Sequence, residues 1–117
     1  MAMAGEGWTA VLLASELPEG RSVRVRFEDE DVMLRRVGER IHAISNLCTH
    51  QGGPLYRGRV SGSGEHLAVT CPIHGSIFQL ADGRVLRGPA MRPVAVFEAR
   101  ISGESVEVRR PADPASS

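Results

Sequence analysis

Two short stretches of this 117-residue sequence decide its fold: residues 48–55 read CTHQGGPL and residues 71–78 read CPIHGSIF. Each stretch offers one thiol and one imidazole, with a glycine close behind the imidazole. Together they contain four side chains that bind metals: Cys48, His50, Cys71 and His74. Four ligands of two kinds, divided evenly between two loops, are typical of a mixed-ligand metal centre. Ligand type alone does not choose between zinc, copper and an iron–sulfur cluster.

The spacing within the loops favours a centre with more than one metal ion. Structural zinc sites usually take ligand pairs separated by about two to four residues, so that both ligands reach one tetrahedral ion. Only Thr49 separates Cys48 from His50, which makes convergence on one ion awkward. We expect each loop to bridge two neighbouring metal ions. A structural zinc module remains an alternative, and so does a lone Cys48–Cys71 disulfide in a secreted domain, although a disulfide leaves the two histidines unexplained.

The two stretches resemble the loops of the Rieske family, in which two cysteines bind one iron of a 2Fe-2S cluster and two histidines bind the other. The first stretch has the family's C-x-H followed by glycine and leucine, and the second matches C-P-x-H-G-x-x-F. Residues 88–93, GPAMRP, resemble the proline-containing loop that packs over the cluster. The resemblance covers about residues 8–110. The match is close to the soluble bacterial ferredoxins of this family, which serve oxygenases.

The resemblance implies a role for each matching residue. Cys48 and Cys71 bind the inner iron as thiolates, while His50 and His74 bind the outer iron and leave one ring nitrogen exposed. A second group contacts the cluster or its ligands: Gly53, Gly75, Ser76 and Pro89. Ser76 either donates its hydroxyl to a cluster sulfur or caps the turn. His42 lies in an expected strand and is not expected to be a ligand.

Two departures from high-potential members of the family bear on the redox potential. Those members carry a tyrosine where this chain has Phe78, and they carry a disulfide between the positions of Gly53 and Ile73. Loss of a hydrogen bond to sulfur and of that disulfide predicts a midpoint potential at the low end of the family's range.

Outside the two stretches, hydrophobic residues recur with a period of two and no long stretch has helical periodicity. The pattern predicts strands over residues 8–13, 22–27, 32–37 and 40–45, with a last pair that contains Val94, Val96, Val106 and Val108. The predicted fold is an all-β, Rieske-type antiparallel β-sandwich over residues 7–110, with a cluster-binding subdomain inserted at about residues 46–90. Residues 1–6 and 111–117 are predicted to be flexible tails.

The composition of the chain argues against some classes of binding partner. The chain has 14 basic and 14 acidic residues and 4% aromatic residues, which argues against a nucleic acid or an anionic membrane as partner. No segment approaches the ~20 apolar residues of a membrane helix, and the N-terminus lacks the core of a signal peptide. We therefore expect a cytoplasmic protein.

No catalytic constellation stands beside the four ligands: we find no serine–histidine–carboxylate set, phosphate loop or mononuclear iron triad. The resemblance implies a single-electron carrier, not an enzyme, that takes electrons from a flavin-containing reductase and passes them to a terminal ring-hydroxylating oxygenase. Docking is expected at the end of the molecule that carries His50 and His74. The alternative is the small subunit of an NAD(P)H-dependent nitrite reductase, which shares the fold. Four arginines that flank the loops form either a docking rim or ordinary surface charge: Arg57, Arg59, Arg84 and Arg87.

Overall fold

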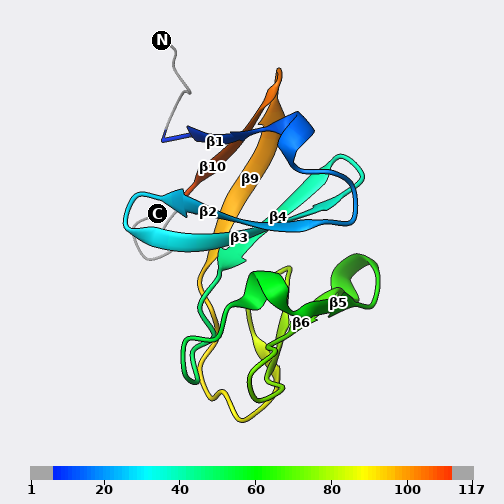
Figure 1. Cartoon of the computed structure of the whole chain (residues 1–117), viewed down its shortest axis with the longest axis vertical. Coiled ribbons are helices and arrows are strands. Elements are labelled where there is room, and N and C mark those ends of the chain that lie inside the picture. Colours follow the sequence, from blue (N-terminus) through cyan, green and yellow to red (C-terminus); the bar gives the residue numbers. More distant parts are fainter. Residues whose placement is uncertain (1–6, 112–117) are drawn as a thin grey trace.

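The computed structural model describes residues 7–111 and contains ten strands in two antiparallel sheets (Figure 1). The larger sheet has the strands β1 (Thr9–Leu13), β2 (Ser22–Phe27), β3 (Glu30–Val37), β4 (Arg40–Ser45), β9 (Val96–Ser102) and β10 (Ser105–Arg109). The smaller sheet has β5 (Arg59–Ser61), β6 (Ala68–Thr70), β7 (Ile77–Gln79) and β8 (Val85–Arg87). Three single turns of 3₁₀-helix join them: η1 (Ala14–Glu16), η2 (Leu55–Arg57) and η3 (Gly64–His66). The predicted all-β antiparallel fold is confirmed.

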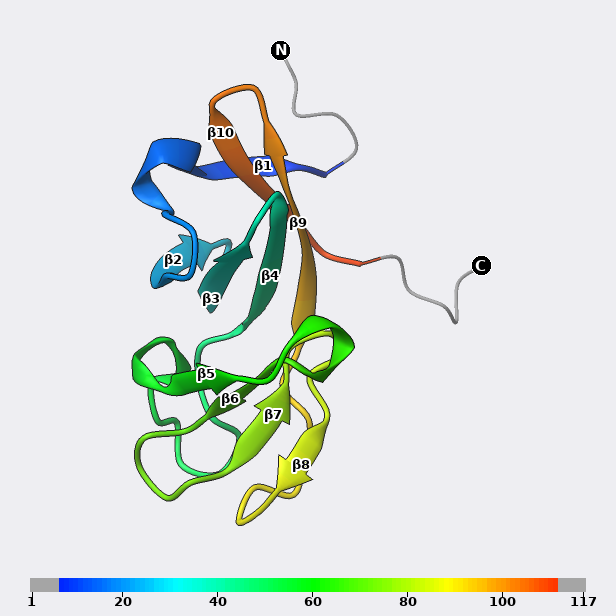
Figure 2. The same ribbon diagram turned by 90° about the vertical axis from the view of Figure 1, so that its right-hand side faces the viewer.

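The strand order explains how the smaller sheet is held. The larger sheet runs β1-β10-β9-β4-β3-β2 and the smaller one runs β5-β6-β7-β8. The whole smaller sheet is therefore inserted between β4 and β9, which pair directly through Ala43–Phe97 and Ile44–Val96. Figures 1 and 2 both show the smaller sheet at one end of the long axis of the molecule.

Alternation along the strands builds a first core inside the larger sheet. Val25 faces Val32 across β2 and β3, and Leu34 faces Ala43 across β3 and β4. Phe27 and Phe97 meet edge to face with ring centroids 5.8 Å apart, a favoured arrangement for buried aromatic pairs. None of the four proposed ligands belongs to this core.

A second core joins the two sheets. Met33 and Ile44 project from the larger sheet and pack in one cluster with Phe78 and Leu55 from the smaller part. Both cysteines, Cys48 and Cys71, belong to this cluster. The pleat separates the two cores, since Met33 and Leu34 are neighbours whose side chains point to opposite faces of β3.

Several expectations need correction or stay open. Val94 precedes β9 instead of lying within a strand, and its N–H donates to the carbonyl of Gly83. The sequence analysis predicted none of the four strands of the smaller sheet, β5 to β8, and did not predict η3. The predicted tails lie outside the described residues, apart from the exposed Pro111. The divisions at 7–110 and 46–90 stay predictions. In the part of the chain that the structure describes, no helix is long and apolar enough to cross a membrane.

Candidate metal centre

The two cysteine loops are built on the same hydrogen-bond pattern. In the first, the N–H of Cys48 donates to the carbonyl of Gly53 at 2.9 Å, and the N–H of Gly52 donates back to Cys48 at 2.7 Å. In the second, Cys71 donates to the carbonyl of Ser76 at 2.7 Å, and Gly75 donates back to Cys71 at 3.1 Å. Each loop is thus a tight turn that begins at its cysteine and exposes its histidine at the bend.

The two thiols lie inside the molecule. Cys48 is 4% exposed and Cys71 is 3% exposed, and both are free. The disulfide considered as an alternative is therefore not formed. Burial raises the pKa of the Cys71 thiol, and the adjacent Cys48 raises this pKa further, while the N–H groups of Ile73 and His74 lower it. Backbone N–H groups that point at a sulfur stabilise a thiolate and hydrogen-bond the sulfur of a metal-bound cysteine.

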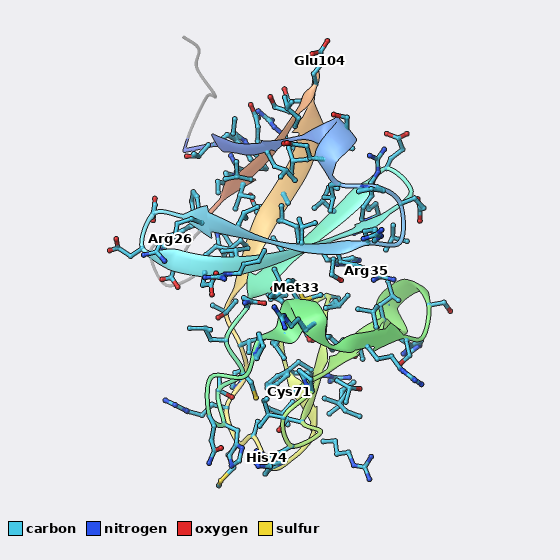
Figure 3. All side chains as sticks on the ribbon, in the orientation of Figure 1. Arg26, Met33, Arg35, Cys71, His74 and Glu104 are labelled. Carbon is cyan, nitrogen blue, oxygen red and sulfur yellow. The ribbon has the colours of Figure 1, made fainter. Side chains whose placement is uncertain are left out.

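The two imidazoles lie outside the thiols, at the surface. His50 and His74 are exposed, and their rings meet edge to face with centroids 5.2 Å apart and planes at 81°. Figure 3 shows His74 at the extreme lower end of the molecule, with Cys71 above it. A pair of imidazoles at the tip and a pair of thiols beneath them form two layers of ligands.

Gly53 explains why the two loops can approach each other. A Cβ at residue 53 would lie 2.7 Å from Sγ of Cys71 and 2.6 Å from Cγ1 of Ile73. Real Cβ atoms essentially never make contacts this short. Only glycine at this position leaves room for the thiol of the opposite loop.

Gly75 has a different reason to be glycine. Its φ of +82° lies in the left-handed region, and nothing lies within 4 Å of an added Cβ. The backbone conformation alone therefore favours glycine, because other residues enter this region only with strain. This conformation lets the loop turn back after His74.

A third loop, residues 88–93, is tied to both cysteine loops. Oγ1 of Thr49 donates to the carbonyl of Arg92 at 2.6 Å, and the N–H of Ala90 donates to Oγ of Ser76 at 2.9 Å. Ser76 is fully buried, and its hydroxyl proton stays available for a second contact. Pro89, expected to contact the cluster or its ligands, is exposed and follows a cis peptide bond.

The role of Asn46 was not predicted from the sequence. This buried side chain accepts a hydrogen bond from the N–H of Tyr56 at 2.7 Å and donates to Oδ2 of Asp31 at 3.3 Å. Its backbone N–H also donates to the carbonyl of Asp31 at 2.8 Å. Asn46 therefore attaches the base of the first cysteine loop to β3. An asparagine two residues before Cys48 was the only available signal.

The layered arrangement bears on the kind of metal centre. Within residues 7–111, no three His, Cys, Asp or Glu side chains converge in a way that could hold one metal ion. Two thiols beneath two imidazoles suit neighbouring metal ions, each with one pair of ligands, better than a single tetrahedral ion.

The other features singled out in the sequence lie elsewhere. His42 is half-buried in β4, and His66 is exposed at the end of η3. A surface groove of about 320 Å³ lies over β4 and β9, lined by His42, Arg40, Phe97 and Glu98 among others. This groove includes none of the four candidate ligands.

Sequence comparison places the chain beside proteins with such centres. Residues 7–98 match the family model described as Rieske [2Fe-2S] domain. The ferredoxin component of the naphthalene 1,2-dioxygenase system of Pseudomonas aeruginosa is 29% identical over 88% of this chain and 95% of its own length. Ferredoxin CarAc of Metapseudomonas resinovorans is 30% identical over 86% of this chain and 92% of its own length.

Solved structures agree with the sequence comparison. The ferredoxin of carbazole 1,9a-dioxygenase from Nocardioides aromaticivorans IC177 superposes with a TM-score of 0.79 and 26% identity, covering 91% of this chain and 100% of that one. A chain in the complex of reduced oxygenase and oxidized ferredoxin of carbazole 1,9a-dioxygenase gives 0.74 and 28%, covering 91% and 97%. A protein from Mycobacterium tuberculosis, described as an NADH-dependent nitrite reductase small subunit, gives 0.77 and 32%, covering 91% and 96%.

Proposed function

The chain belongs to the Rieske [2Fe-2S] domain family, and from this premise we propose that it is a single-electron carrier that delivers electrons to a terminal oxygenase. One observation carries the proposal: two buried thiols lie beneath two exposed imidazoles at the tip of the molecule. A ferredoxin needs this arrangement, because its redox centre must be shielded from water and still lie within a short distance of a partner.

The residues at the tip fit a 2Fe-2S cluster. We assign Cys48 and Cys71 to the inner iron and His50 and His74 to the outer iron. The space beside Cys71 that a Cβ at Gly53 would fill supports this assignment, as do the N–H groups that Ile73 and His74 direct at the Cys71 sulfur. A bound 2Fe-2S cluster supplies a one-electron couple whose potential depends on its ligands and on hydrogen bonds to its sulfurs.

The remaining residues of the tip orient the ligands and exclude water. The second core packs Leu55 and Phe78 in the same cluster as the thiols. Ser76 holds the third loop through Ala90 and keeps a proton for a sulfur atom. We also propose that residues 46–90 act as a cluster-binding subdomain of a domain that spans 7–110, and that the protein works in the cytoplasm.

Electron transfer, not substrate conversion, is the activity that the relatives support. Two of them are named as ferredoxins, one of them as the ferredoxin component of a dioxygenase system. One solved complex joins a ferredoxin to the oxygenase of carbazole 1,9a-dioxygenase. By analogy, a terminal oxygenase accepts the electron from this chain and a flavin-containing reductase supplies it. Docking at the His50/His74 end should be transient, with an interface below ~1,200 Å².

A second candidate function rests on one comparison. The protein described as a nitrite reductase small subunit shares 32% identity with this chain, so the chain could instead belong to an NAD(P)H-dependent nitrite reductase. Pull-down from the source cell separates the two: a large sirohaem-containing subunit indicates nitrite reductase, and an oxygenase with a flavin reductase indicates the ferredoxin. Electron delivery from the reductase through the purified protein to that oxygenase then tests the proposal directly.

A further inference from the structure

Charge is distributed unevenly between the two ends of the molecule, although the whole chain is neutral. Residues 46–93 contain five arginines, Arg57, Arg59, Arg84, Arg87 and Arg92, against two acidic residues, Glu65 and Asp82. The rest of the described chain, 7–45 and 94–111, has nine arginines against ten acidic residues. The end that carries the cysteine loops therefore has a net charge of +3, and the larger sheet is close to neutral or slightly acidic.

Of the nine arginines in residues 7–45 and 94–111, four are paired with carboxylates: Arg24, Arg100, Arg109 and Arg110. Arg24 lies 2.7 Å from Asp31, and Arg100 lies 2.7 Å from Glu107. Arg110 contacts both Glu28 and Glu30, at 2.9 and 3.2 Å. These pairs neutralise charge locally, and the ten acidic residues of this part of the chain balance its nine arginines.

Of the five arginines in residues 46–93, only Arg84 has such a partner in the described part of the chain. Within residues 7–111, no carboxylate lies within 4.0 Å of a cationic nitrogen of Arg59, Arg87 or Arg92. Arg87 is the strand neighbour of Ile77, just after the second cysteine loop, and Arg92 accepts the hydrogen bond of Thr49 from the first. Two of the arginines named from the sequence differ: Arg84 faces Asp82 at 3.9 Å, and Arg57 lies over the ring of Tyr56.

Exposed apolar side chains gather at the same end. Five large hydrophobic residues of the described chain are exposed, and four of them lie between residues 46 and 93: Leu47, Ile73, Leu86 and Met91. Met91 is 91% exposed, between Arg87 and Arg92 in sequence, and Ile73 is 52% exposed, directly before His74. Exposed apolar side chains together with arginines in one part of the molecule are typical of a protein interface.

We propose that the tip surface, made of His50, His74, Ile73, Met91, Arg87 and Arg92, docks a redox partner whose own docking face has an apolar centre rimmed by carboxylates. This inference rests on the proposed function and adds the signs of the charges: basic on this chain and acidic on the partner. Arg87 and Arg92 steer the tip to the acidic rim, and Ile73 and Met91 lose water on contact. Complementary charge raises the association rate and fixes orientation more than it raises affinity, as a transient carrier requires.

The acidic partner face can be replaced by a defined surface. The holoprotein is adsorbed on gold coated with a carboxylate-terminated alkanethiol monolayer and, separately, with an amine-terminated one, and voltammetry records the electron transfer. A wave on the carboxylate film and a much weaker one on the amine film are expected. Raising the ionic strength from about 0.01 M to about 1 M shortens the Debye length from ~30 to ~3 Å, and the wave should shrink roughly fivefold or more.

Charge reversal supplies the decisive variants. Arg87→Glu/Arg92→Glu should lose the wave on the carboxylate film and gain one on the amine film, and Arg87→Gln/Arg92→Gln should give an intermediate result. The matched control is Arg21→Glu/Arg26→Glu, which changes the net charge equally. Both of its residues are exposed on the larger sheet, and Figure 3 shows Arg26 far from His74. This control should keep the wild-type wave.

The outcomes distinguish a failure of the docking proposal from a failure of the proposed function. A coloured protein with equal waves on both films overturns the docking proposal and leaves the electron-carrier function intact. An equal loss in the Arg21/Arg26 variant also overturns it, since net charge and not the tip would then control adsorption. A colourless wild-type protein overturns the proposed function, and the docking proposal with it.

Discussion

Gly53 and Cys71 belong to different loops, yet no room for a methyl group remains between them: a Cβ at residue 53 would lie 2.7 Å from Sγ of Cys71. This contact joins the two halves of the candidate centre. It also makes the centre sensitive to the smallest possible side chain at residue 53.

We predict that Gly53→Ala separates the two loops and prevents normal cluster assembly. Inserting a methyl group into a packed site costs about 1–3 kcal/mol, and here the strain falls on a ligand. Iron content and the visible spectrum after anaerobic purification measure the effect. Gly88→Ala is the control, because its added Cβ would meet only ordinary contacts, the nearest at 3.7 Å. Full cluster content in Gly53→Ala would contradict this account of the loops.

Ser76→Ala should destabilise the protein, because the N–H of Ala90 loses its only hydrogen-bond acceptor in the described structure. An unsatisfied buried N–H costs about 1–3 kcal/mol, so the free energy of unfolding should fall by that amount in urea titrations with an unchanged slope. Ser102→Ala, at the exposed last residue of β9, should change the unfolding free energy by less than about 0.5 kcal/mol. A similar small effect of Ser76→Ala would show that the third loop is held by other contacts.

How much of this could be read from the sequence differs between parts of the chain. β2, β3 and β4 have a clear period of two, and the structure confirms them. The four strands of the smaller sheet, β5 to β8, contain three residues each, too few to show any period. The four candidate ligands were visible as residue types at a characteristic spacing. The close approach of Gly53 to Cys71 was not visible, because it depends on how two loops meet in space.

The contacts around the cysteine loops could not be predicted from the sequence either. Thr49 and Arg92 form a hydrogen bond although they are 43 residues apart in the sequence, and no local sequence pattern predicts such a pair. Arg92 was absent from the arginines expected to flank the loops for the same reason. Asn46 could be noticed only as a polar residue beside the first loop, and its partner Asp31 lies on another strand.

The stability of the folded protein should fall when the pH drops below about 6.5, and His42 should contribute to this loss. Burial lowers the pKa of His42 from its ordinary value of 6.5, and the positive charge of Arg40 lowers this pKa further. Unfolded chains therefore take up a proton on this residue at a higher pH than folded ones do, which favours unfolding as the pH falls. Other charged groups that line the adjacent grooves are Glu65 and Glu98.

Chemical denaturation of the apoprotein between about pH 7.5 and pH 5 measures this contribution. His42→Gln should reduce the loss of unfolding free energy over that range, whereas His66→Gln, at an exposed residue, should leave it unchanged. Identical pH profiles for the wild type and His42→Gln would show that His42 is not held in its neutral form.

The midpoint potential should lie in the lower part of the Rieske range, which extends from about −150 to +300 mV. Phe78 is fully buried and has no hydroxyl to donate to a sulfur, and Gly53 and Ile73 cannot form a disulfide. Both absences leave the reduced, more negative state less stabilised. Protein film voltammetry near neutral pH gives the value. A midpoint above roughly +100 mV, in the upper part of that range, is incompatible with delivery of electrons to an oxygenase.

The central claim is that two cysteines and two histidines hold one 2Fe-2S cluster, and pulsed EPR of the reduced protein, prepared with ¹⁵N-labelled histidine, tests it most directly. The account predicts a red-brown protein with iron and acid-labile sulfide and couplings from two imidazole nitrogens. His50→Ala should lose the parental spectrum, and His42→Ala should keep it. A colourless protein with stoichiometric zinc, or a cluster without histidine couplings, would contradict the account.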